Sequence, residues 1–233
     1  MRNFKIGFEL EGKFNQNIYY KTRKLGDYKG DGSVTVSDYL GNSIREEEFA
    51  SYANFVKPTL ELLRTFIIGE NYIYNNTCGL HLHVSLFDYP SSILQNLATS
   101  WSFISKLQGE AGTMCECVQA RLKGNRFCQK YNKANFMYDA ENGTKYRFCR
   151  FHPIGTLEFR FLAPCEHRED NIMKLLTLID DYLFLAKKIY SQEVEDEKTK
   201  NQKIIINFEK IENAETINIV IDNCQPSSIN LNL

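Results

Sequence analysis

The sequence has no apolar run close to the roughly 20 residues that a membrane-spanning helix needs. Its first ten residues, MRNFKIGFEL, also lack the apolar core of a secretory signal. Neither sign of charge is in excess, since 28 Lys and Arg stand against 29 Asp and Glu. This balance argues against proteins that bind nucleic acid through bulk electrostatics. We therefore expect a cytoplasmic protein with neither a membrane nor a nucleic acid as its partner.

Paired cysteine motifs are also missing. The seven cysteines are scattered, no CxxC pair occurs, and Cys115 and Cys117 are separated by one residue. An odd, scattered set is typical of reduced thiols in a cytoplasm. We therefore expect neither a disulfide framework nor a structural zinc site.

The composition suits one folded domain with an appendage. Hydrophobic residues make up 43% of the 233 residues and aromatic residues 13%, which is enough for a sizeable core. We expect a catalytic domain over residues 1–190. Residues 191–201 are charged and predict a linker or a solvated helix end. The remainder of the 191–233 tail could add one or two strands, and its last ten residues have a composition typical of disorder.

Hydrophobic periodicity predicts an α+β protein in which helices cover one face of an antiparallel sheet. Alternation of apolar and polar residues predicts strands over 4–11, 33–37, 44–50, 79–87, 145–151 and 156–162. Helical spacing predicts helices over 58–68, 90–109, 113–123 and 168–190.

Three of these strands combine an apolar face with a face of charged or metal-binding side chains. Residues two apart leave the same face of a strand, so each pair points one way. A solvated sheet face would carry a mixture of Lys, Thr, Ser and Glu, not two of the chain's four histidines side by side. The pairs are Glu9 and Glu11, His81 and His83, and Glu158 and Arg160.

This set of side chains suits a divalent cation and a phosphoryl group. Carboxylate oxygens with one neutral imidazole are the ligands of Mg²⁺ or Mn²⁺. An arginine beside such a carboxylate can clamp a phosphoryl oxygen, because its planar guanidinium holds anions in a fixed geometry. The chain contains no GxxxxGK[ST] motif, so ATP would bind without a P-loop.

The motifs GFELEG, DGS, CGLHLHVSL and TLEFRF occur in that order. Together, over roughly residues 4–185, they resemble the amidoligase family of carboxylate–amine ligases, which is related to glutamine synthetase. The GxHxH element is the most specific, whereas ExE and DGS alone are weak. The resemblance implies a glutamine synthetase-like fold, a curved antiparallel sheet cupping ATP and divalent metals with helices behind it.

The resemblance also implies an activity and a set of metal ligands. The reaction would be ATP-dependent formation of a peptide or isopeptide-like amide through an acyl phosphate. The partners would be an amine and a carboxylate-bearing amino acid, peptide or protein. One metal would be held by Glu9, His81 and Glu158, and the other by Glu11 and Glu48.

Further roles fall on residues around these ligands. By resemblance, His83 would contact phosphate or substrate, and Arg160 would stabilise the transferring phosphoryl group. Asp31 of DGS would orient or deprotonate the amine. Basic residues on the strand predicted over 145–151 offer additional phosphate contacts. Because Phe148 is expected to face the core, strand alternation favours Arg147 and Lys145 as the residues on the opposite face, with the site.

The chain departs from the family pattern in two places. Three consecutive glutamates, 46–48, stand where the family has one; Glu48 fits best, but Glu46 shares its strand face. The strand before TLEFRF carries Phe-Cys-Arg-Phe over 148–151 in place of a pattern containing Asn, and a nearby arginine could substitute. Two alternatives to the ligase stay open. One is a metal-dependent hydrolase or phosphotransferase using the same residues, and the other is a catalytically inactive binding protein.

Overall fold

The computed structural model describes residues 4–30, 43–68, 71–75, 78–87, 89–126, 128–141, 146–196, 204–207, 216–221 and 228–230. Within these ranges, residues 43–47, 124, 141, 185–196 and the last three segments are described by their backbone alone. The strand predicted over 33–37 lies outside the described residues, as do two predicted site residues, Asp31 and Lys145.

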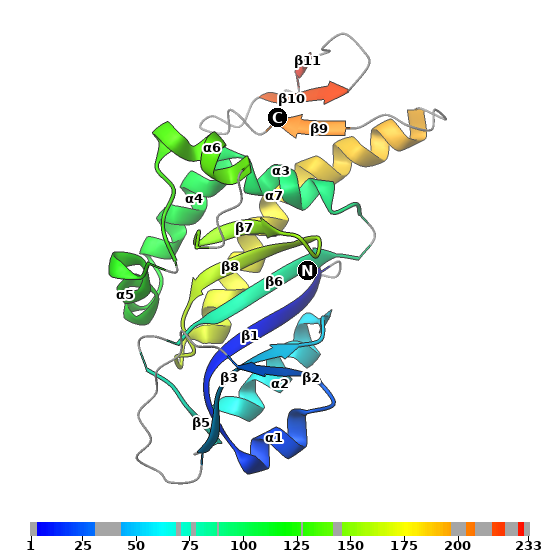
Figure 1. The fold of residues 1–233 in the computed structure, drawn as a ribbon. Coiled ribbons are helices and arrows are strands. Elements are labelled where there is room, and N and C mark those ends of the chain that lie inside the picture. The colour runs from blue at the N-terminus through cyan, green and yellow to red at the C-terminus, as the bar shows by residue number, and fades with distance from the viewer. Residues whose placement is uncertain are drawn as a thin grey trace.

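An antiparallel sheet forms the centre of the fold (Figure 1). Its strands follow the order β2-β3-β1-β6-β8-β7, and β4 and β5 make short additional pairings with β1. The sheet and its helices confirm the α+β class. The strands are β1 Phe4–Asn15, β2 Gly26–Gly30, β3 Ser43–Ser51, β4 Asn54–Phe55, β5 Tyr72–Ile73, β6 Leu80–Leu86, β7 Cys149–His152 and β8 Thr156–Leu162.

Helices pack against this sheet, and Figure 1 shows α2 and α7 behind it. The helix predicted over 168–190 runs on to Asp196, so the first part of the charged 191–201 stretch is a helix end. Among the described residues, no helix has the length and apolar character needed to cross a membrane. The helices are α1 Gln16–Thr22, α2 Val56–Ile67, α3 Ser92–Ala98, α4 Trp101–Gly112, α5 Glu116–Gly124, the 3₁₀ turn Lys133–Asn135, α6 Phe136–Glu141 and α7 Arg168–Asp196.

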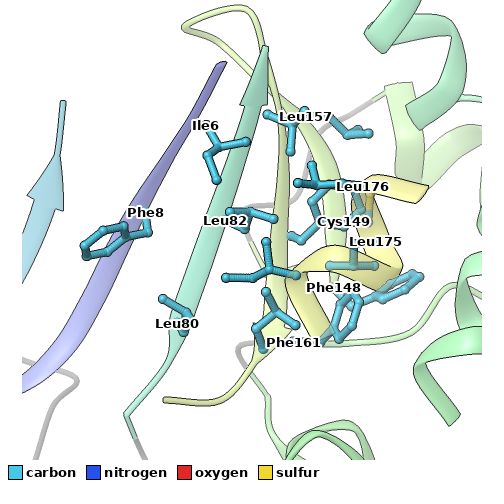
Figure 2. Close-up of a cluster of buried hydrophobic side chains, with 14 of the residues drawn as sticks. Ile6, Phe8, Leu80, Leu82, Phe148, Cys149, Leu157, Phe161, Leu175 and Leu176 are labelled. Carbon is cyan, nitrogen blue, oxygen red and sulfur yellow. The ribbon is translucent and has the colours of Figure 1, made fainter. Parts of the chain in front are cut away.

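The apolar faces of the central strands form the core, as their alternation predicts. Figure 2 shows this layer packing against Leu175 and Leu176 of α7. Each large side chain buried there contributes about 1.5–3 kcal/mol, so the core fixes which face of each strand points away from the helices. Among the apolar residues of β1, β6 and β8 that are fully or almost fully buried are Phe4, Ile6, Phe8, Leu10, Leu80, Leu82, Val84, Leu157, Phe159 and Phe161.

The single helix predicted over 90–109 is wrong, because the chain forms α3 and α4 with a break between them. Ser100 has extended backbone angles, and its hydroxyl accepts a hydrogen bond of 3.3 Å from the backbone N–H of Phe103. Serine competes with the helix for backbone donors and so favours helix starts. Hydrophobic spacing alone did not reveal this start.

Replacing Ser100 with alanine is expected to lower the free energy of unfolding by about 1 kcal/mol, because the N-terminal amide of α4 loses its acceptor. The matched control is Ser105→Ala on the exposed side of the same helix, which should change stability by less than about 0.5 kcal/mol. Urea denaturation followed by circular dichroism measures both. Equal midpoints for the two variants would rule out the capping role.

The described residues of the tail beyond α7 form three strands, where one or two were expected. They are β9 Ile204–Asn207, β10 Thr216–Ile221 and β11 Ser228–Asn230, paired antiparallel in the order β11-β10-β9. The last of them falls within the ten terminal residues whose composition suggested disorder. This small sheet is separate from the central one.

Candidate functional site

The central strands bring their polar side chains together through their register. Glu9 on β1 lies directly opposite His81 on β6, and His83 lies opposite Glu158 on β8. The Glu9 carboxylate lies between the two imidazoles, with Oε2 2.9 Å from His81 Nδ1 and Oε1 3.2 Å from His83 Nε2. These four side chains, predicted as site residues from the sequence, therefore form one cluster.

The second glutamate of β1 joins the same cluster from its other side. Glu11 lies opposite Glu48 of β3, and its Oε1 is 3.4 Å from His81 Nε2. Its Oε2 accepts a hydrogen bond of 2.5 Å from the backbone N–H of Gly79. The register therefore places Glu48 beside the other acidic residues, whereas the side chain of Glu46 lies outside the described part of the chain.

Two groups of these side chains could each hold a metal ion. Glu9, His83 and Glu158 form one, Glu9, Glu48 and His81 form the other, and the ligand atoms within each group lie within 4.8 Å of one another. Ligands at about 2.0–2.6 Å from a shared Mg²⁺ or Ca²⁺ ion have this order of separation. The two groups share Glu9, so one carboxylate could bridge two cations. The histidines are thus distributed differently from the sets that the family resemblance implies, in which His81 joins Glu9 and Glu158.

His83 fits the part of a metal ligand especially well. Its Nδ1 makes a 3.0 Å hydrogen bond with the hydroxyl of Thr156, which fixes the orientation of the ring. Its Nε2 is buried and has no partner with hydrogen-bond geometry. A ring held at one nitrogen, with the other directed at carboxylates, is the usual arrangement of a histidine that binds a metal.

Two arginines converge on Glu158. Arg160 donates a hydrogen bond of 2.6 Å to Glu158 Oε1, and Arg150, directly opposite in β7, donates through Nε to Oε2. The carboxylate is almost fully buried, and both guanidinium groups are mostly buried. Arg150 was not expected here, but it supplies the arginine that could replace the family's Asn-bearing strand pattern.

The prediction that Arg147 lies on the site face is wrong. Its guanidinium forms a 2.5 Å ion pair with Asp139, donates to the carbonyl of Lys130 at 3.1 Å and lies over the ring of Tyr131. The reason is that β7 begins only at Cys149, so the alternation of that strand does not extend back to Arg147.

The carboxylates at the centre of the cluster are held in their charged form. Burial by itself would raise the pKa of Glu9, but the adjacent imidazoles of His81 and His83 lower it far below its usual value. Burial would likewise raise the pKa of Glu158, and electrostatic interaction with His81, Arg160, His83 and Arg150 lowers it. Two anionic carboxylates are thus retained at the centre of the cluster.

Sequence patterns did not reveal Arg121 as part of this region. It is buried on α5, donates to the carbonyl of Cys78 at 2.5 Å and to the carbonyl of Arg160 at 3.3 Å. It therefore ties the segment before β6 to β8 beside the site. No short motif surrounds it, and Lys123 on the same helix is equally prominent in the sequence.

His152 is a second neighbour of the cluster that sequence patterns did not reveal. Its ring lies 5.2 Å from that of His83, and its Nδ1 accepts a hydrogen bond from the backbone N–H of Ile154. Burial lowers its pKa, which favours a neutral imidazole at the edge of the site.

Comparisons with protein-family models, with curated proteins and with solved structures gave no match for this chain. The function must therefore be inferred from the side chains themselves. Burying several carboxylates, two histidines and two arginines together costs folding free energy that an apolar cluster would not, so such clusters are most often retained for binding or chemistry.

Proposed function

We propose that this protein is an ATP-dependent carboxylate–amine ligase of the amidoligase type with a glutamine synthetase-like fold, using Mg²⁺ or Mn²⁺. The observation that carries the proposal is the pair of overlapping ligand groups around Glu9, with Arg150 and Arg160 on the same face. Glu9, Glu48, His81, His83 and Glu158 would hold the cations.

This arrangement suits transfer of a phosphoryl group. Such a transfer needs alignment of the reacting oxygens and neutralisation of negative charge more than covalent assistance. Bound divalent cations supply charge neutralisation and orientation of the phosphates. The guanidinium groups of Arg150 and Arg160 lie beside Glu158, where each could turn toward an anionic oxygen.

Amide formation is favoured over other phosphoryl transfers by the ordered motifs of the amidoligase resemblance. In that reaction the substrate carboxylate accepts the γ-phosphoryl group, and the amine then displaces phosphate from the acyl phosphate. His83 is proposed to contact phosphate or substrate in addition to its place among the cation ligands. The roles of Asp31 with the amine and of Lys145 with phosphate remain predictions from the sequence.

The proposal is tested by measuring ADP and phosphate release from ATP in the presence of Mg²⁺, over a matrix of carboxylates and amines. Free amino acids, short peptides and ammonia form the first matrix. A ligase is expected to release ADP only when a carboxylate and an amine are both present. Hydroxylamine should replace the amine and give a hydroxamate, because it captures an activated acyl group.

Two outcomes would contradict the ligase. ADP release that depends on metal but is unaffected by any amine would identify a hydrolase or phosphotransferase. Binding of ATP and metal without turnover of any pair of substrates, peptides and proteins included, would identify a binding protein. Omitting Mg²⁺ and adding a chelator serve as the control for the cation requirement.

A further inference from the structure

Three cysteines meet at a second position, formed by segments that are far apart in the sequence. Cys115 is the residue that precedes α5, Cys117 lies in its first turn, and Cys165 lies shortly before α7. The sulfur atoms of Cys115 and Cys165 are 3.5 Å apart, and the three sulfurs all lie within 4.8 Å of one another. The Glu/His cluster contributes none of its ligands to this group.

The spacing of these sulfurs is that of a metal–thiolate site. Zn–S bonds of about 2.3 Å in a tetrahedral site place the sulfurs about 3.8 Å apart. A disulfide, in contrast, requires about 2.05 Å between the sulfurs. None of the three sulfurs takes part in a disulfide, so the three thiols are available as ligands.

The surroundings of Cys115 favour negatively charged sulfur, the form that binds a metal. The side-chain amide of Asn171, in the first turn of α7, donates a hydrogen bond of 3.2 Å to Cys115 Sγ. Cys115 also stands at the N-terminus of α5, where the helix dipole is positive. The segment that carries Cys165 is fixed next to it, because the guanidinium of Arg168 donates to the carbonyl of Cys165 at 3.0 Å.

We propose that Cys115, Cys117 and Cys165 bind a Zn²⁺ ion that joins the N-terminal end of α5 to the segment before α7. Three thiolates fill three tetrahedral positions, and soft sulfur ligands select Zn²⁺ over Mg²⁺. Because Cys117 is exposed, the fourth position faces solvent and takes water or an external ligand. The inference goes beyond the ligase proposal and does not depend on it.

The proposed ion would fix the position of α5 and thus of Arg121. That arginine bonds the carbonyls of Cys78 and Arg160, beside the Glu/His cluster. The zinc ion would therefore help to hold α5 in its place beside β8.

The test is titration of the full chain with Co²⁺ under a thiol-free reductant, followed by displacement with Zn²⁺. Cobalt held by sulfur gives an intense near-ultraviolet charge-transfer band, which carboxylate and imidazole ligands do not produce, together with the visible bands of a tetrahedral site. We expect these bands to saturate at one ion per chain. Cys117→Ser should reduce the charge-transfer band and weaken Zn²⁺ binding at least about tenfold, because one of three thiolates is lost.

Cys117 is exposed, so this variant tests binding without threatening the core. Cys128→Ala is the matched control, because it removes a buried thiol outside the cluster and should leave the cobalt spectrum unchanged. Glu158→Gln should also leave the sulfur bands unchanged, which separates this site from the Glu/His cluster. Absence of sulfur bands in the reduced protein, or bands unaffected by Cys117→Ser, would overturn the proposal.

Discussion

Replacing Glu158 with glutamine is expected to reduce amine-dependent ADP release by at least about a thousandfold. The substitution removes the negative charge that completes one candidate ligand group with Glu9 and His83. The side-chain size is retained, so any loss reflects charge and ligand chemistry. ADP release at saturating Mg²⁺ and ATP, together with thermal unfolding with and without Mg²⁺, measures the effect.

Stability should change in the same variant by a smaller amount. Arg150 and Arg160 both donate to the Glu158 carboxylate, and the amide nitrogen of glutamine would place a donor against one of them. A buried donor left without an acceptor costs about 1–3 kcal/mol. Stabilisation by Mg²⁺ should also be lost, since the cation would bind the native state less tightly.

Glu169→Gln is the matched control for this experiment. Glu169 pairs with Arg64 at 2.5 Å on the surface, away from the cluster, and the Arg64 hydrogen bond lowers its pKa. Exposed pairs contribute about 0–1 kcal/mol, so activity should be unchanged. Full activity of Glu158→Gln would refute the assignment of Glu9, His83 and Glu158 as cation ligands, whether the reaction is a ligation or another phosphoryl transfer.

The sequence predicted the faces of the strands but not how the strands meet. Alternation is a local property, so Glu9, His81 and Glu158 could be assigned to the polar face directly. Which histidine approaches Glu158 depends on the register between β6 and β8, which shifts between Leu80 and Leu82. Such an irregularity arises from pairing between distant segments, and no pattern within one strand encodes it.

The wrong placement of Arg147 and the unexpected grouping of three cysteines have a similar origin. Arg147 was placed by continuing the alternation back past the first residue of β7, and Arg150 takes the site face instead. A group of cysteines was not expected because Cys115 and Cys117 lack CxxC spacing. The third sulfur of that group comes from Cys165, 50 residues from Cys115, so a rule about spacing along the chain could not find it.

Gly79→Ala is expected to reduce amine-dependent ADP release by about a hundredfold while leaving the fold in place. A Cβ atom at this position would lie 2.9 Å from Glu11 Oε2, 2.9 Å from His81 Nε2 and 2.7 Å from Arg121 Nη2. Those distances are too short, so the three side-chain ends must move. Because they are the ends of side chains, the stability cost should stay within about 1–3 kcal/mol. The main effect of Gly79→Ala should therefore be on the positions of these three side chains and not on stability.

The control is Gly109→Ala, at a helical position in α4 where an added Cβ would have no neighbour within 4 Å. Alanine there should raise stability by about 0.5–1 kcal/mol and leave activity unchanged. Steady-state ADP release and Mn²⁺ binding, followed by paramagnetic resonance, would be compared for both variants. If Gly79→Ala keeps its activity and its Mn²⁺ affinity, then the contact between Glu11 and His81 has no part in the site. If both fall while the cooperative unfolding transition remains, the glycine is needed for the close approach of Glu11 to His81 and not for folding.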